Sequence, residues 1–162
     1  YSSPLIRSTE TVKTILDRSG NNNTELYLDD NLIEVDVGDW ALANLGDESN
    51  PSITEIRQFF KDPFSSPGAP NGENVHQVIK RTQAFIKNLA SKNDDKTYLV
   101  GTHGFAMRAM LNFLYEDKDD FWHGKVPYNC CFNILEVKDG KITISDEDIC
   151  FYQGEKKDYY GK

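Results

Sequence analysis

A histidine that follows a short apolar run is the first side chain in this sequence placed to do chemistry. His103 comes after the β-type run of residues 98–100, within the turn 101–104, and a long apolar segment at 105–115 then follows without Pro or a further Gly. This pattern predicts a strand, a tight turn and a helix. Ligands of open α/β sheets bind at the carboxyl ends of strands, and helix N-termini attract anions. The imidazole can therefore meet an anion, although a histidine at such a turn is equally often structural.

An arginine near the start of the first predicted helix is the second candidate. Ser and Pro residues at 2–4 form a helix-start signal, and we expect a helix over residues 2–17. Arg7 then lies in the first turn, where the helix dipole disfavours a cation. It is either a solvated surface side chain or a group that grips a phosphate together with the helix N-terminus, using its planar fork of donors.

A pair of carboxylates in the segment LIEVDVGDW, residues 32–40, is the third candidate. Glu34 and Asp36 alternate with apolar residues, which predicts an extended segment with both carboxylates on one face. Trp40 offers a large apolar wall, and a carboxyl group beside such a wall can have its pKa raised into the range of a general acid. An exposed strand face with solvated carboxylates is the alternative interpretation.

The elements that must position these residues indicate an α/β domain. We expect helices at 51–61 and 75–89 in addition to those above, a mobile rim loop at 63–72, and a hairpin of strands 131–138 and 141–148 around Asp139-Gly140. Short strands are also expected at 25–28 and 32–40. The order of elements fits a three-layer α/β/α sandwich with a mostly parallel central sheet and a C-terminal antiparallel hairpin.

Composition limits the possible partners and the cellular setting. The 162 residues suit one domain, and the net charge of −8 with 18 scattered basic residues argues against a nucleic-acid or anionic-membrane surface. No apolar run approaches a membrane span, and no signal peptide is visible. Three cysteines without C-x-x-C spacing and three distant histidines form no metal site. A cytoplasmic location is the simplest expectation.

Four short motifs in this order resemble the histidine phosphatase superfamily, the phosphoglycerate mutase-like group. They are SSPLIRS at 2–8, LIEVDVGDW at 32–40, NGENV at 71–75 and GTHG at 101–104. The resemblance covers nearly the whole chain, through the closing hairpin, and implies a single domain over residues 1–162. It implies transfer of a phosphoryl group from a small phosphorylated metabolite through a phosphohistidine, with no metal or cofactor. The implied activity is that of a phosphomonoester hydrolase or of a mutase-type phosphotransferase.

The resemblance also implies roles for the three candidates. Arg7 is similar to the second phosphate-binding arginine of the family, His103 to the second histidine, and Glu34 to the residue that donates and accepts a proton. Glu34 is preferred to Asp36 because the family places this carboxylate four residues before the glycine, here Gly38.

Further substrate contacts are expected beside these residues. Gly104 follows the histidine directly, and Asn129 lies in the loop 121–129, which could shape the pocket wall together with Trp122. For Asn129 and Trp122 a structural role is the commoner alternative.

The sequence also departs from the family pattern. The signature L-x-x-R-H-G that carries the nucleophile is absent, and neither His76 nor His123 has a strand–turn–helix context that could replace it. We therefore expect a further strand–helix unit before Tyr1. Residues 41–42 are Ala-Leu where the family usually has Glu-Gly, and Asn74 replaces a common serine. A non-catalytic phosphate-binding or regulatory domain that lacks the nucleophile is the alternative from another functional class.

Overall fold

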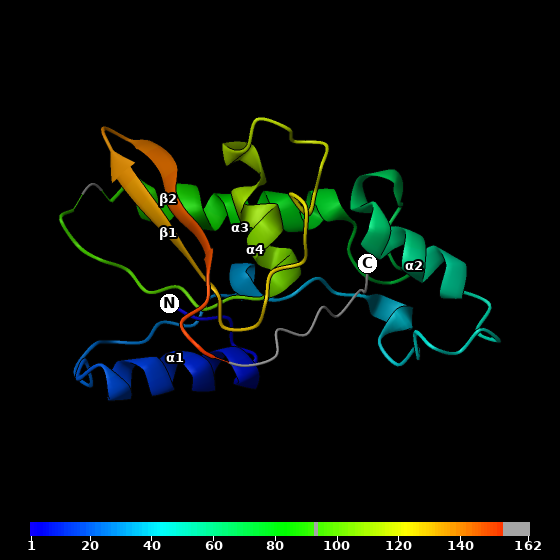
Figure 1. Ribbon diagram of the computed structural model, residues 1–162, viewed down its shortest axis with the longest axis horizontal. Helices are drawn as coiled ribbons and strands as arrows, with labels where there is room; N and C mark the ends of the chain where they lie inside the picture. The colour runs from blue at the N-terminus through cyan, green and yellow to red at the C-terminus, as the bar shows by residue number, and fades with distance from the viewer. Residues whose placement is uncertain (93, 154–162) are drawn as a thin grey trace.

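The computed structural model describes residues 1–92 and 94–153 and has a mixed helix and strand architecture (Figure 1). No helix in these two ranges is long and apolar enough to cross a membrane. The combination of helices with a β-hairpin confirms the α/β class expected from the sequence. In chain order the helices and strands are α1 (Ile6–Arg18), α2 (Ile53–Lys61), α3 (Val75–Ala90), α4 (Gly104–Leu111), β1 (Phe132–Lys138) and β2 (Lys141–Ile149), with 3-10 turns at Asp30–Leu32, Gly38–Trp40, Pro63–Ser65 and Asn112–Leu114.

Three extended segments far apart in the sequence lie side by side near the N-terminus. Ser2 forms parallel bridges with Leu28 on one side and with Gly101 on the other. The Ser2 N–H donates to the Tyr27 carbonyl and the Ser3 N–H donates to the Gly101 carbonyl, each over 2.9 Å. Over the described ranges, parallel pairing is confined to these two bridges. The three-layer sandwich and its mostly parallel sheet thus stay predictions.

The C-terminal hairpin expected from the sequence is confirmed. β1 and β2 pair antiparallel, from Phe132 opposite Ile149 to Lys138 opposite Lys141. Asp139 and Gly140 both have positive φ, 51° and 73°, as a two-residue hairpin turn with this right-handed twist requires.

Helices cover both sides of the three extended segments (Figure 1). On the α1 side the approach is close, because a Cβ on Gly101 would lie 2.3 Å from the Val12 side chain. On the other side the Tyr1 ring lies 5.5 Å from that of Phe85 on α3. Gly101 therefore allows α1 to approach the strand end that leads directly to His103.

Two hydrophobic clusters hold the helices together. The larger one joins α2, α3 and α4, and its Phe105 ring stacks on Phe59 with a centroid distance of 5.3 Å. The smaller one packs α3 and α4 against the extended segments and the hairpin; its buried members are Leu32, Phe85, Ile86, Leu89 and Met110. Phe105, the second residue of α4, is thus fixed by the core, which makes the start of this helix a rigid platform.

Several expectations about local structure are wrong. The runs at 25–28 and 98–100 are extended but are not strands, because only isolated bridges, at Leu28 and at Gly101, are found there. α1 begins at Ile6 rather than at residue 2, because the backbone at the N-terminus pairs with two extended segments: Ser2 donates to Tyr27 and accepts from the Asp29 N–H over 3.0 Å, and the Ser3 N–H donates to the Gly101 carbonyl. The segment 32–40 is not a strand. It begins and ends in 3-10 turns, and the carbonyls of residues 32–34 accept hydrogen bonds from side chains rather than from a neighbouring strand.

Candidate active site

The start of α4 brings together two of the residues singled out from the sequence. His103 is the N-cap residue of α4 and Gly104 its first residue. The Glu34 carboxylate accepts a hydrogen bond from the Ala106 N–H over 3.0 Å and one from the Phe105 N–H over 3.4 Å. These amides belong to the first turn, whose N–H groups have no partner within the helix. Glu34 therefore occupies the anion-attracting end of the helix that His103 begins.

Burial governs the protonation of Glu34. Desolvation raises the pKa of its carboxyl group, against the opposing effect of the Val35, Ala106 and Phe105 amides and of the Arg7 charge. A carboxyl group whose pKa is raised toward the working pH can hold and release a proton, as a general acid must. The neighbouring Asp36 is exposed, and its Oδ1 accepts the Gly38 N–H over 2.9 Å. The two carboxylates that the sequence places on one face thus have different environments.

The His103 imidazole is half-buried and neutral. Desolvation, together with the positive charges of Arg7 and Arg81, lowers the pKa of His103 to about 4. Its Nε2 lies 2.8 Å from the Ser3 Oγ, which itself accepts the Leu5 N–H over 3.3 Å. Because that acceptor role leaves the Ser3 hydroxyl proton free to point toward Nε2, the contact suits an unprotonated Nε2.

Arg7 is exposed in the first turn of α1, a turn that holds no acidic residue. Its positive charge acts on both site groups, since it contributes to lowering the pKa of His103 and opposes the rise of the pKa of Glu34. An incoming anion would therefore meet an available guanidinium group beside the imidazole.

The other residues singled out from the sequence have different surroundings. Asn129 is exposed in the turn before β1, and its substrate contact stays a prediction. Trp122 Nε1 donates to the Phe60 carbonyl over 2.7 Å, and its ring packs edge-on against Phe105. Trp122 thus has a structural role in the larger cluster. His76 is exposed, with its ring near that of Phe64.

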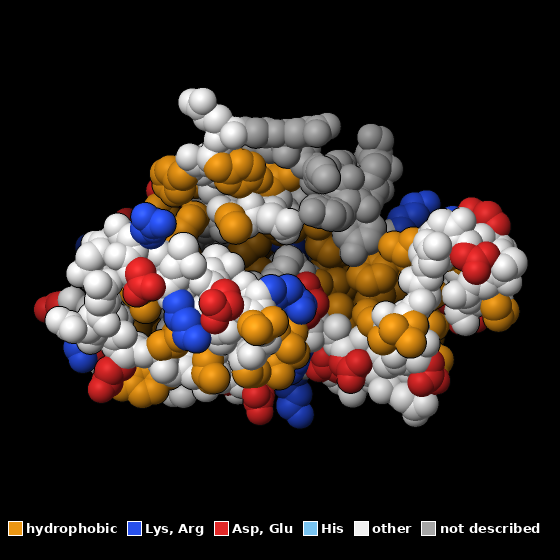
Figure 2. Space-filling model, turned by 90° about the horizontal axis from the view of Figure 1, so that it is seen from below, with side chains coloured by type: hydrophobic (Ala, Val, Ile, Leu, Met, Phe, Trp, Pro, Cys, Tyr) orange, Lys and Arg blue, Asp and Glu red, His pale blue; other side chains and the backbone are white. Residues whose placement is uncertain are grey.

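The view from below shows a recess between the surface of α1 and the lobe that contains α2 (Figure 2). Hydrophobic side chains are visible within it, and charged side chains of both signs lie on the outer surface of α1.

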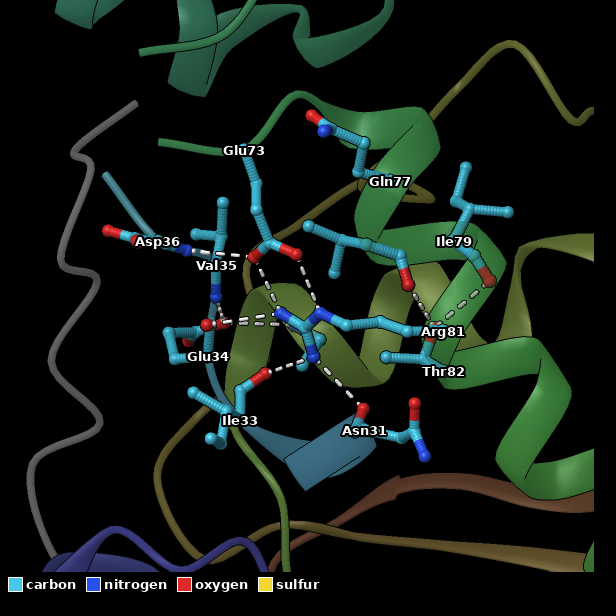
Figure 3. A network of polar contacts seen from close by, with 12 residues as sticks. Asn31, Ile33, Glu34, Val35, Asp36, Glu73, Gln77, Ile79, Arg81 and Thr82 are labelled. Carbon is cyan, nitrogen blue, oxygen red and sulfur yellow. Dashed lines mark hydrogen bonds and ion pairs between the residues drawn. The ribbon is translucent and has the colours of Figure 1, made fainter. Parts of the chain in front are cut away.

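Sequence reasoning missed two residues that support Glu34. Arg81, on α3, donates to three backbone carbonyls of the segment that carries Glu34 and forms an ion pair with Glu73 (Figure 3). Glu73 lies within the motif NGENV, but nothing in the sequence indicates that the partners of Arg81 are backbone groups. The sequence does carry one signal for Arg81 itself, because this long cationic side chain borders the apolar stripe of α3, next to the buried Val78 and Thr82.

Comparisons with known proteins find a relative and solved structures that are similar to this chain. A curated relative, phosphoserine phosphatase 1 of Hydrogenobacter thermophilus, is 26% identical over 156 residues, which cover 96% of this chain and 72% of the relative. The structure of Bacillus stearothermophilus YhfR matches with a TM-score of 0.80 and 23% identity, covering 91% of this chain and 72% of that one. The alpha-ribazole phosphatase of Shigella flexneri matches with a TM-score of 0.70 and 18% identity, over 88% and 69% of the two chains.

The family comparison covers most of the sequence. The model of the histidine phosphatase superfamily, branch 1, matches residues 1–148. This range includes all four motifs and the residues that meet at the start of α4, and it extends through most of the closing hairpin. The chain belongs to the histidine phosphatase superfamily.

Proposed function

We propose that this protein hydrolyses a phosphomonoester of a small phosphorylated metabolite, without a metal ion or cofactor. One observation carries the proposal: a partly buried carboxyl group, Glu34, and a neutral imidazole, His103, both lie at the N-terminus of α4 within the field of Arg7. Phosphoryl transfer depends mainly on placing charges and proton donors around the transferred group. Family membership and the phosphatase names of the relatives support the same reaction class.

In this proposal each site residue has a separate task. Arg7 and His103 hold the oxygens of the phosphoryl group, and Gly104 and Asn129 contact the substrate. Glu34, in its protonated form, gives its proton to the leaving alcohol oxygen as the P–O bond breaks. The resulting carboxylate then accepts a proton from the water that attacks the phosphoryl group on the enzyme.

The nucleophile in this proposal is a histidine from outside the 162 residues. The other two histidines of the chain have other surroundings: His76 is exposed, and the His123 ring stacks on Tyr115 with a centroid distance of 3.5 Å. We propose that a strand–helix unit preceding Tyr1 provides it, within one domain that includes residues 1–162. That strand would extend the parallel pairing seen at Ser2 into the central sheet of a three-layer sandwich.

Hydrolysis is favoured over mutase activity by the short connection between Glu34 and the motif at 71–75. Phosphoglycerate mutases of this group usually carry a longer insertion there, so the transfer to a second substrate is the less favoured reaction. We place the enzyme in the cytoplasm, and the three free cysteines support this location.

A phosphate-binding domain without catalysis is the second candidate. It is favoured by the same observation that requires an outside nucleophile, namely that one histidine of the chain lies at the α4 site while His76 and His123 lie elsewhere. Such a domain would keep Arg7 and His103 as anion ligands and would bind inorganic phosphate without turning over a phosphomonoester.

The test compares two histidine variants of the protein as its gene encodes it, with any residues that precede Tyr1. His103→Ala should lower turnover of p-nitrophenyl phosphate by about 100- to 1,000-fold, the usual loss for a group that stabilises transition-state charge. His76→Ala is the matched control, because His76 is exposed on α3, and its activity should stay near that of the wild type. Near wild-type turnover in His103→Ala would contradict the proposal. Phosphate binding without turnover in the wild type would favour the binding domain.

A further inference from the structure

The backbone of the segment that carries Glu34 is hydrogen-bonded to side chains, whereas the backbone of a strand is hydrogen-bonded to neighbouring strands. Residues 31–34 have no strand partner, yet their four successive carbonyls all accept hydrogen bonds from side chains. Those of residues 31, 33 and 34 accept from Arg81 over 2.9, 2.6 and 3.1 Å. That of residue 32 accepts from Thr102, which precedes His103, over 2.9 Å. Backbone groups in a partly buried segment require such partners.

Every N–H donor of Arg81 is used in this arrangement (Figure 3). Three N–H groups of the guanidinium go to the carbonyls just described, and the Nε and one Nη2 group go to the two oxygens of Glu73, each over 2.8 Å. The Arg81 and Glu73 side chains are only 18% and 21% exposed. A guanidinium has five donors in a planar fork, whereas an ammonium group has three around one point. Lysine therefore cannot reproduce these contacts.

Glu73 is fixed to the same segment from the other side. Its Oε2 accepts the Asp36 N–H over 3.0 Å, and its own N–H donates to the Asp36 carbonyl over 2.8 Å. This approach needs a glycine before it, because a Cβ on Gly72 would lie 2.4 Å from the Asp36 carbonyl oxygen. Burial acts to raise the pKa of Glu73, but Arg81 and the Asp36 amide together lower it. Glu73 thus stays ionised and keeps the guanidinium oriented.

We propose that Arg81, oriented by Glu73, is a positioning residue that sets the Glu34 carboxyl group on the first turn of α4. This inference rests on the proposed function, in which Glu34 protonates the leaving group. Arg81 touches the backbone of residue 34 rather than the carboxyl group. It therefore acts through the placement of Glu34, and a displacement of about 1 Å at such a group can cost about 100-fold in rate.

A positioning role can be distinguished from a structural one by the leaving group. An alkyl alcohol needs a proton as it departs, whereas p-nitrophenolate departs without one, so a misplaced general acid affects only the first substrate strongly. The measurement is kcat/KM of the full gene product on glycerol phosphate and on p-nitrophenyl phosphate, because kcat/KM reports the first phosphoryl transfer and excludes the later attack of water, which is common to both substrates. The variants are Arg81→Lys, Glu73→Gln and Glu34→Gln. We expect Arg81→Lys to lower kcat/KM on glycerol phosphate about 100-fold, with kcat/KM on p-nitrophenyl phosphate little changed.

The matched control is Arg57→Lys. Arg57 on α2 also forms a two-bond ion pair, with Glu48 over 2.6 and 3.0 Å, and also donates to a backbone carbonyl, that of Leu45. That pair is largely exposed, with side-chain values of 48% and 73%. Arg57→Lys should leave both rates unchanged, because it removes the same kind of contact away from the segment of Glu34.

Glu73→Gln keeps the size of the side chain and tests the orienting step. It should produce the same leaving-group selectivity in a milder form, and it serves if Arg81→Lys does not fold. A carboxyl NMR titration of Glu34 in the full gene product gives a readout that does not need turnover. In Glu73→Gln and Arg81→Lys the pKa of Glu34 should fall toward its ordinary value, because a loosened segment admits water.

Two outcomes would overturn the inference and are distinguishable from each other. In the first outcome, Glu34→Gln loses activity selectively on glycerol phosphate, but Arg81→Lys and Glu73→Gln either keep their activity or lose it equally on both substrates. Arg81 then does not position the acid, and the proposed function stands. If Glu34→Gln itself shows no leaving-group dependence, the general-acid role is wrong, and the inference built on it is wrong with it.

Discussion

The Glu34 carboxylate and the Ala106 N–H group are joined by a hydrogen bond of 3.0 Å, so a carboxyl group lies directly on the positive end of α4. The helix end and desolvation act in opposite directions on this group. Desolvation is the larger effect, and the pKa of Glu34 is raised. The site therefore combines fixed placement of the carboxyl group with retention of its proton to higher pH than on a surface glutamate.

Replacement of Glu34 by Gln should lower turnover of an alkyl phosphomonoester about 100- to 10,000-fold, the range for loss of a general acid. In the wild type, kcat should fall as the pH rises through the raised pKa of Glu34, because the acid must carry its proton to donate it. Glu34→Gln should remove this limb of the pH–rate profile.

Asp36→Asn is the control for this experiment, since Asp36 is exposed two residues away on the same segment. Its pH–rate profile should match that of the wild type. A wild-type limb retained in Glu34→Gln would assign the titration to another group.

The neutral state of His103 should make folding stability depend on pH. The pKa of His103 is lowered from 6.5 to about 4. Between these values the unfolded chain binds a proton that the folded chain does not, so the free energy of unfolding falls as the pH is lowered from 6.5 to 4. Above pH 6.5 both the folded and the unfolded chain hold the neutral imidazole, so His103 causes no loss of stability there. Urea unfolding at a series of pH values should show this decrease, and an imidazole NMR titration should give the folded pKa directly.

His103→Gln should unfold with a shallower dependence on pH across this window, because glutamine takes no proton. His76→Gln is the control and should keep the wild-type dependence. A His103 resonance that titrates near 6.5 in the folded protein would rule out the buried, neutral imidazole.

Local signals explain the parts of the structure that could be predicted. Asn74 and Gln77, three positions apart, form a capping box at the start of α3, and the Asp139-Gly140 pair marks the hairpin turn. α4 also begins directly after His103, where the glycines and the apolar run indicate the start of a helix. In each case the residues that decide the conformation are within a few positions of one another, so a single sequence carries the signal.

Long-range pairing explains the parts that could not be predicted. The alternation at 32–40 is typical of a strand, but its carbonyls are taken by Arg81 and Thr102, about 50 and 70 positions further along the chain. The same holds for Glu34, whose acceptor role at α4 depends on contacts across the whole domain. Alternation reports the burial of side chains, and it carries no information about which group pairs with the backbone.

Arg7 should govern the affinity for phosphate. Replacement by Met removes a charged donor of the anion, and each hydrogen bond to a charged group contributes about 1.5 to 3 kcal/mol. We expect the inhibition constant of inorganic phosphate to rise about 10- to 100-fold. Because the Arg7 charge also helps to lower the pKa of His103, that pKa should rise in Arg7→Met without phosphate. Arg18→Met, at the other exposed end of α1, should change neither quantity. Unchanged phosphate inhibition in Arg7→Met would identify it as a surface residue.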